Sequence, residues 1–449
     1  MKKFSKVDSV AMKCGIIIFL VVLLIIPINM ITDLVAERQS SRKHVIQEIS
    51  HKWGQSQTII GPILSIPYIR SNKPYSNSVT EYAHFLPESL NIDSNLLPEK
   101  RSRNLHETVV YKSISTITGE FKFPDISGLG INLMNLDLKN AIISLGITDS
   151  KGISETIEFE ANQQKLQFRP GLSNSDVLSS GVHTPLTIEK DKDIKFSIKS
   201  VIRGSEFIHF VPIGKETNVK INSSWSSPSF EGSFLPSQRK ISDKGFEANW
   251  KVLNLNRNYP QKWLGKQFNI ATSSFGVRLF IEANIYQQTT RSVKYAFLFI
   301  LLTFTAFFFC EILYKRQIHP IQYLLIGLSI VIFYTLLLSL SEYISFDIAY
   351  WVSTTAIVGI ITLYASAILK SKQMALAICT VLSHLYGFLF VLLQLEDMAL
   401  LLGSFGLFLA LAASMYLSKD VDWYKLSDHI KPPIDPTQND VSTEDESKK

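Results

Sequence analysis

The sequence predicts a membrane protein with six transmembrane α-helices, one N-terminal and five C-terminal, and a large, predominantly antiparallel β domain inserted after the first helix. Apolar stretches long enough to cross ~30 Å of hydrocarbon occur once near the N-terminus and five times after residue 292. The breaks between the later stretches alternate between positively charged and acidic. The region between the first two stretches alternates apolar and polar residues, as half-buried strands do.

The composition agrees with this fold class. Only 19 % of the residues are charged, below the ~25 % of soluble domains. The net charge of +6 is not gathered into a basic patch with interleaved aromatic residues, so the sequence predicts no nucleic-acid partner. Membrane lipids are the expected surroundings.

The first predicted span covers residues 14–35, after a cytoplasmic N-terminus of residues 1–13 that carries four lysines. The alternative is a cleaved signal peptide. No small-residue cleavage site follows the apolar run, and the residues after Asn29 keep a helical pattern, so an uncleaved signal anchor is favoured. Pro27 is expected to bend this helix, because it removes one backbone hydrogen bond.

Residues 36–292 form the predicted β domain. Its clearest strand is Asp193–Arg203, in which Ile194, Phe196 and Ile198 share one face. The predicted strands are Ile63–Ile69, Thr80–Phe85, Thr108–Ile117, Ala141–Ile147, Thr156–Glu160, Leu166–Arg169, Asp193–Arg203, Glu206–Val211, Val219–Asn222, Phe246–Val252 and Phe275–Tyr286. Arg38–Trp53 has a helical pattern that could continue the anchor helix. The domain contains no cysteine, so its own core must stabilise it.

A bundle of five spans occupies residues 293–417. The spans are 293–313, 321–340, 348–369, 374–393 and 398–417. The positively charged breaks contain Lys315 and Arg316, then Lys370 and Lys372, then Lys419 and Lys425. The breaks between them contain Glu342 and Asp347, then Glu396 and Asp397, and no Lys or Arg. The positive-inside rule therefore places both termini in the cytoplasm and the β domain outside it. The cytoplasmic tail, residues 418–449, is predicted to be disordered after residue 430.

A search for catalytic and cofactor motifs finds none. P-loop, HExxH, GxSxG and dinucleotide-binding patterns are absent from the sequence, and so are Cys/His clusters with zinc spacing. We therefore expect no enzyme activity, cofactor or metal. His84, His106, His183 and His209 are scattered through the β domain without ligand spacing and are expected to be structural.

Three ionisable residues in the bundle are candidate functional residues. His384 lies near the middle of the fifth span, where an ionisable group is costly. A purely structural histidine there would hydrogen-bond to a neighbouring helix, through Tyr334, Ser366 or Thr362. Glu342 and Glu311 lie at span ends and are expected to reach interfacial water.

Gly406, Ala410 and Ser414 form a stripe of small residues on the sixth span. Such stripes let helices approach closely, so the stripe predicts packing within the bundle or between copies. The oligomeric state does not follow from it.

Several blocks of the sequence closely resemble the CreD family of bacterial inner-membrane proteins. The blocks are GPILSIPY (Gly61–Tyr68), HFLPESL (His84–Leu90), SWSSPSFEGSFLP (Ser224–Pro236), HPIQYLLIGLSIVIFYTLLLSLSE (His319–Glu342) and DWY (Asp422–Tyr424). The resemblance implies the bacterial inner membrane, a periplasmic β domain and a part in cell-envelope integrity. It also implies a link to a two-component stress response and to colicin and β-lactam phenotypes. It supplies no catalytic residue.

Three functional hypotheses follow. The favoured one is a non-enzymatic envelope protein whose periplasmic domain binds a protein, peptidoglycan or lipid partner. The alternative is a transporter or lipid-handling protein with His384 and Glu342 along a path; unchanged fold and phenotype in His384→Ala would refute it. An enzyme acting on the envelope has no motif to support it, and only a cluster of His183 or His209 with carboxylates in a cleft would favour it.

Overall fold

The computed structural model describes residues 10–70, 79–103, 106–279, 285–313, 317–395 and 398–419. The chain divides into two compact units. The helical unit comprises Met1–Ser40 and Asn284–Lys449, and the β-rich domain comprises Ser41–Ala283. The predicted tail after residue 430 and the predicted loop charges Lys315, Arg316, Glu396, Asp397 and Lys425 lie outside the described residues.

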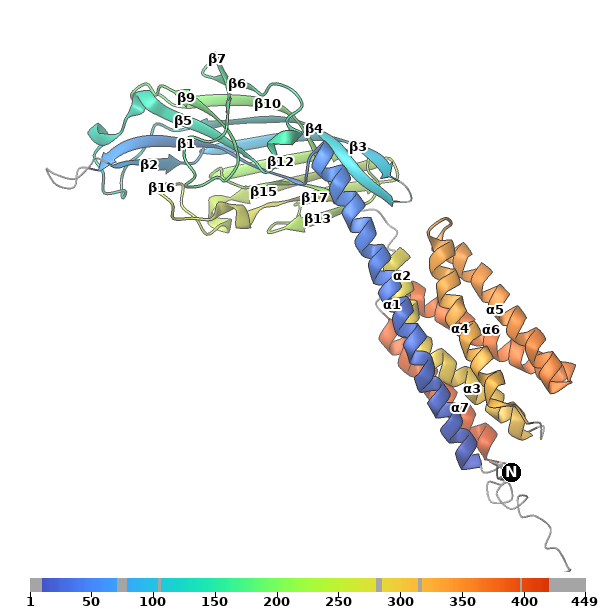
Figure 1. The fold of residues 1–449 in the computed structure, drawn as a ribbon. Helices are drawn as coiled ribbons and strands as arrows, with labels where there is room; N and C mark the ends of the chain where they lie inside the picture. Colours follow the sequence, from blue (N-terminus) through green and yellow to red (C-terminus); the bar gives the residue numbers. More distant parts are fainter. Residues whose placement is uncertain are drawn as a thin grey trace, which may run out of the picture. The chain divides into compact units, whose positions relative to one another are not determined.

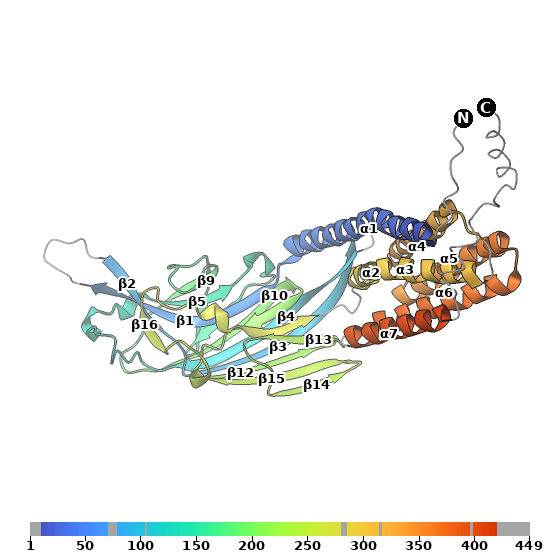
Figure 2. The same cartoon turned by 90° about the horizontal axis from the view of Figure 1, so that it is seen from below.

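Two sheets form the β-rich domain (Figure 1). Among the described residues, a nine-stranded sheet follows the order β13 (Pro228–Gly232), β17 (Phe275–Leu279), β11 (Phe207–Phe210), β1 (Gln57–Arg70), β5 (Ala141–Ile147), β9 (Gly181–Leu186) and β8 (Arg169–Pro170), with β2 (Val79–Phe85) paired to β1 and β16 (Lys262–Leu264) paired to β2. The eight-stranded sheet follows the order β14 (Gln238–Ser242), β15 (Gly245–Leu253), β12 (Glu216–Ser223), β3 (Ser89–Arg103), β4 (His106–Phe121), β10 (Ile194–Ser205), β6 (Glu158–Ala161) and β7 (Gln164–Gln167). Figure 2 shows β12, β15 and β14 side by side.

Most strand pairs are antiparallel, as predicted. The parallel pairs in the described part are β1 with β11 and β3 with β12. Gln57 is opposite Ile208, and Ser89 is opposite Glu216. Each parallel pair therefore joins an early strand to one that is more than a hundred residues later, and antiparallel strands flank both.

Period-two burial explains how the sheets hold together. In β10, Ile194, Phe196 and Ile198 are buried, whereas Lys195 and Lys199 on the other face are exposed. The inward faces of both sheets contribute to one apolar core. Trp250 of β15 lies 5.6 Å from Phe275 of β17 between ring centroids, so aromatic side chains join the two layers.

Two sequence predictions need correction here. The predicted strand Phe275–Tyr286 ends earlier, since β17 ends at Leu279 and Ile285 begins helix α2 (Ile285–Lys294). The predicted span 293–313 corresponds to α3 (Ala296–Leu313), but the sequence did not predict that α2 precedes it at a bend of 44°. Helix α2 belongs to the helical unit, although the sequence placed most of its residues in the β domain.

Helix α1 (Val10–Trp53) is a single helix of 44 residues, about 66 Å long. Pro27 lies inside it without ending it. The helix begins in the helical unit and ends in the β-rich domain, which confirms that Arg38–Trp53 is helical. Gly54 follows the last residue of the helix; its φ of +142° suits glycine, and a Cβ there would lie 2.7 Å from the carbonyl oxygen of Arg203.

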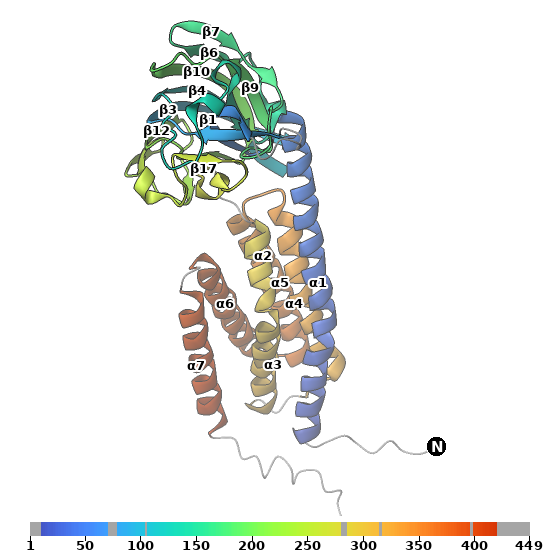
Figure 3. The same ribbon diagram turned by 90° about the vertical axis from the view of Figure 1, so that its left-hand side faces the viewer.

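The other long helices are α4 (Pro320–Ser341), α5 (Phe346–Leu369), α6 (Lys372–Gln394) and α7 (Ala399–Ser418). Among the described residues, five helices are long and apolar enough to cross a membrane, or six if the bent pair α2–α3 counts as one span. In α4, His319 caps the N-terminus and Pro320 occupies the first turn, where its missing N–H has no helical partner. Figure 3 shows α1 to α6 gathered in one bundle and α7 beside α6.

Aromatic side chains fill the centre of this bundle. The ring of Phe333 on α4 lies 5.6 Å from that of Tyr350 on α5 and 4.8 Å from that of Tyr386 on α6. The hydroxyl of Tyr350 donates to the carbonyl oxygen of Tyr386 at 2.6 Å. Gly327 of α4 lies so close to Leu24 of α1 that a Cβ would be 2.2 Å from its side chain. Small residues that leave room for the side chains of a neighbouring helix are typical of helix packing in membranes.

Candidate functional sites

Glu311 of α3 is buried and bound on several sides, contrary to the expectation that it reaches interfacial water. Its side chain is 7 % exposed and pairs with the ammonium group of Lys13 on α1. Tyr323 donates its hydroxyl to Oε2 at 3.2 Å, and the N–H of Ile318 donates to Oε1 at 3.3 Å. A buried carboxylate needs such partners to offset its lost hydration.

A cavity of about 360 Å³ adjoins this ion pair. Apolar side chains of α1, including Met12, Ile16 and Ile17, form one wall, and Lys13 and His319 contribute polar groups. The cavity therefore combines a charged end with an apolar wall, as an amphiphilic ligand would require.

Glu342, which follows α4, also contacts α1. Its side chain is 12 % exposed, and its Oε1 lies 4.0 Å from Nε of Arg38. The hydroxyl of Tyr286 donates to the same oxygen at 3.3 Å. Glu342 thus has a small exposed surface, and Arg38 of α1 and Tyr286 of α2 contact its carboxylate.

The two ion pairs hold α1 at both ends of its apolar stretch. Lys13 and Arg38 are separated along the helix by about 37 Å, at 1.5 Å per residue. That distance slightly exceeds the ~30 Å of hydrocarbon in a bilayer. Each cation therefore lies just beyond the stretch that a membrane would cover, and each finds a carboxylate of the bundle there.

His384 has no partner in a neighbouring helix among those predicted. Its ring is exposed on the surface of the helical unit, and Nδ1 lies 2.8 Å from the carbonyl oxygen of Thr380, one turn earlier in α6. The predicted bonds to Tyr334, Ser366 or Thr362 are therefore not formed.

The stripe of Gly406, Ala410 and Ser414 lies on the half-buried side of α7. A Cβ on Gly406 would be 2.4 Å from the ring of Phe388 on α6. The small residue thus permits close approach of these two helices, and packing between copies stays a prediction.

His209 of β11 belongs to a polar cluster. Its Nε2 lies 3.2 Å from Oε1 of Glu231, and its ring stacks on Phe207 with centroids 4.4 Å apart. Arg278 bonds to Oε2 of Glu231 at 3.0 Å and to Glu206 at 3.2 Å. Burial lowers the pKa of His209, although Glu231 opposes this shift. The cluster joins strands β11, β13 and β17, so its side chains are engaged in cross-strand contacts.

Ser65, His84 and Asp176 form a chain of contacts that sequence reasoning missed. Ser65 Oγ lies 2.9 Å from Nδ1 of His84, and Nε2 of His84 lies 3.3 Å from Oδ2 of Asp176. These are the residue types of a hydrolytic triad. Ser65 is only 2 % exposed, and the serine meets Nδ1 rather than Nε2, so the serine is not presented as a nucleophile.

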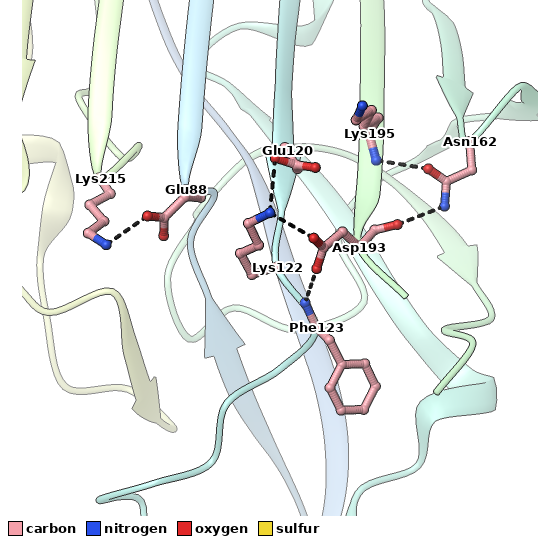
Figure 4. Close-up of polar contacts among 8 residues, drawn as sticks. All are labelled: Glu88, Glu120, Lys122, Phe123, Asn162, Asp193, Lys195 and Lys215. Atoms are coloured by element: carbon pink, nitrogen blue, oxygen red, sulfur yellow. Dashed lines mark hydrogen bonds and ion pairs between the residues drawn. The ribbon is translucent and has the colours of Figure 1, made fainter. Parts of the chain in front are cut away.

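Exposed ion pairs order one end of the eight-stranded sheet (Figure 4). Lys122 lies 2.7 Å from Asp193, whose other carboxylate oxygen accepts the N–H of Phe123 at 3.0 Å. The hydrogen bond with Lys122 lowers the pKa of Asp193. Asn162, in the turn between β6 and β7, donates to the backbone of Asp193 and accepts from that of Lys195. Exposed ion pairs contribute little stability. We therefore infer that these contacts fix the conformation of this turn.

The described residues contain no group of three or more His, Cys, Asp or Glu side chains that could hold a metal ion. The expected absence of a cofactor stays a prediction. The ion-pair partners Lys13 and Arg38 were also missed, although both are cations at the ends of an apolar run.

Comparison with known proteins gives a consistent result. A family model described as "Inner membrane protein CreD" matches residues 9–424. The chain is also 34 % identical over 444 residues to the Inner membrane protein CreD of Escherichia coli (strain K12), covering 95 % of each chain.

Replacing Glu311 by Ala should destabilise the helical unit by about 3 kcal/mol, the lower end of the range for breaking a buried pair. The lower end applies because Lys13 keeps a third of its surface exposed. Denaturation of the purified chain by increasing SDS measures the change. The double variant Lys13→Met with Glu311→Met serves as the control and should recover most of the loss, because no charge is left unpaired. Equal stability of wild type and Glu311→Ala would contradict the pairing.

The stability of the β-rich domain should fall on acidification. Burial lowers the pKa of His84, although Asp176 opposes this shift. The unfolded chain takes up a proton at about pH 6.5, whereas folded His84 takes it up only at a lower pH, so its contribution is fully present above pH ~6.5 and is lost as the pH falls towards the pKa of the folded group. Urea unfolding followed by circular dichroism should show a smaller loss from about pH 7.5 to about pH 5.5 in His84→Gln than in wild type. The exposed His44→Gln is the control, and identical pH dependence in wild type and His84→Gln would refute the assignment.

Proposed function

The chain belongs to the CreD family of inner membrane proteins, and on that premise we propose that it is a non-enzymatic protein supporting cell-envelope integrity or the envelope-stress response. It is a multi-pass membrane protein of the inner membrane. Its β-rich domain binds a partner in the envelope, and its helices hold that domain at the membrane.

The proposed orientation follows from the charges between spans. Lys370 lies between α5 and α6 and Lys372 begins α6, whereas Glu342 follows α4 and Asp347 lies in the first turn of α5, with no Lys or Arg between them. This pattern favours N- and C-termini in the cytoplasm and a periplasmic domain at residues 36–292.

One observation carries the proposal: α1 is a continuous helix shared by both units. Within the helical unit, Lys13 and Arg38 pair with carboxylates. Within the β-rich domain, the guanidinium groups of Arg101 and Arg203 lie 3.7 and 4.7 Å from the ring centroid of Trp53, and Glu48 pairs with Arg103. The helix is therefore anchored by charged groups at both ends.

This attachment suits a protein that transmits a displacement of its β-rich domain along α1. A flexible linker would absorb a displacement of the domain, whereas a continuous helix such as α1, which Pro27 does not end, can transmit it along its axis. Partner binding by the β-rich domain would then reach the Lys13–Glu311 pair through α1. No chemical step is needed for this role, in agreement with the lack of a catalytic motif in the sequence.

One feature favours the alternative, a transporter or lipid-handling protein. The cavity beside Lys13 and Glu311 has an apolar wall and a charged end, as a lipid would require. His384 gives this alternative little support, because its ring bonds within its own helix. We therefore rank it second.

Cysteine labelling tests the orientation. With Cys14, Cys310 and Cys379 replaced by Ala, a single cysteine is introduced at Lys165 in β7 or at Lys370 between α5 and α6. An impermeant maleimide should label Lys165→Cys in intact spheroplasts, but Lys370→Cys only after the membrane is permeabilised. Labelling of Lys370→Cys alone in intact spheroplasts would invert the proposed orientation.

A helix insertion tests the function. A Gly-Ser-Gly-Ser insertion between Ser40 and Ser41 should abolish the protection of a deletion strain against envelope stress, because it uncouples the two units. The matched control inserts about two turns of Ala, Glu and Lys residues, which lengthens the helix without interrupting it. This control should retain protection. If both insertions protect as well as wild type, at equal amounts in the membrane, a coupling role for α1 is excluded.

A further inference from the structure

The β-rich domain contains a cavity of about 700 Å³. It lies beside the ends of β1 and β5 and is closed by two chain segments, residues 175–180 and 266–271. Its volume falls within the ~300–1,000 Å³ typical of small-molecule sites. All the residues that line it belong to the β-rich domain.

Asp176 is one of the residues that line this cavity, and buried side chains contact its carboxylate. His84 contacts Oδ2 of Asp176, and Ser65 contacts His84. A neutral imidazole has one donor and one acceptor, so the chain is satisfied when Ser65 donates to Nδ1 and Nε2–H donates to Asp176. The ring of Trp263, 5.5 Å from that of His84 between centroids, packs against the imidazole.

This arrangement places an oriented negative charge at the cavity. His84 is fully buried, whereas the side chain of Asp176 keeps 28 % of its surface exposed. His84 contacts one carboxylate oxygen, which leaves the other oxygen without a contact to His84, and Asp176 is among the residues that line the cavity. Support of a binding group by buried hydrogen bonds is how proteins fix the geometry of a site.

The remaining lining has complementary chemistry. Lys266 supplies a positive charge, and the amides of Gln267 and Asn269 can donate and accept hydrogen bonds. Leu178 and Phe268 add apolar surface. A ligand that uses all three kinds of group carries an ammonium group, a carboxylate and an apolar part.

We propose that this cavity binds a small zwitterionic ligand of the short-peptide class, with its ammonium group on Asp176 and its carboxylate near Lys266. His84 and Ser65 are positioning residues for Asp176 and do not touch the ligand. The assignment deepens the proposed function, because it names the class of ligand that the β-rich domain receives.

The full-length chain in lipid nanodiscs is titrated with a panel of free dipeptides Xaa-Ala, in which Xaa is each standard amino acid, and with their N-acetylated forms. Isothermal titration calorimetry measures the affinities. At least one free dipeptide should bind the wild type, and N-acetylation should weaken that binding about tenfold, because it removes the ammonium group that pairs with Asp176.

Asp176→Asn should weaken the free dipeptide by a similar factor and abolish the difference between free and acetylated forms. Ser65→Ala should weaken binding less than Asp176→Asn. The exposed Asp243→Asn, in the turn between β14 and β15, is the matched control and should bind as wild type. Circular dichroism and thermal unfolding establish that each variant is folded.

The proposal is overturned if no dipeptide of the panel binds, if acetylated and free forms bind wild type equally, or if folded Asp176→Asn keeps wild-type affinity. This failure is distinct from failure of the proposed function. The insertion between Ser40 and Ser41 leaves the residues of the cavity unchanged. If this variant loses protection against envelope stress but binds dipeptides as wild type does, the coupling role of α1 is separated from ligand recognition.

Discussion

The backbone of α1 must satisfy its hydrogen bonds internally wherever lipid surrounds it, and the rest of the architecture follows from that requirement. A helix meets it for the apolar stretch, and here the same helix continues to Trp53 in the β-rich domain. Pro27 removes one bond without ending the helix. The attachment of the domain is therefore an extension of the transmembrane segment itself.

The spans could be predicted from the sequence because hydrocarbon thickness sets their length, and this constraint is local along the chain. The ion pairs could not, because Lys13 and Glu311 are 298 residues apart. A sequence shows that a cation and a carboxylate lie at span ends, and it does not show which helices are neighbours. Glu311 and Glu342 were therefore expected to meet water, whereas each meets α1. The bend between α2 and α3 was missed for a related reason, because the length of an apolar stretch does not show where the helix axis changes direction.

In the β-rich domain, too, local patterns could be predicted from the sequence, whereas contacts between distant residues could not. Strand β10, which alternates clearly, and strand β5, which is a short apolar run, were predicted nearly to their ends. Strand β3 was missed, although Leu90, Ile92 and Leu96 point inward, because Asn, Asp and Ser between them resemble turn residues and Ser94 takes an inward place. The cavity beside Asp176 depends on residues from four separate segments, so only the folded chain reveals it.

The parallel strand pairs have a consequence for biosynthesis. Strand β1 cannot complete its pairing until β11 has been made, and β17 must still follow at Phe275–Leu279. At about 5–20 residues per second, the ribosome needs roughly 10–45 s to pass from the first strand to the last. During that interval the nascent sheets expose unpaired edges, which are templates for pairing with another chain.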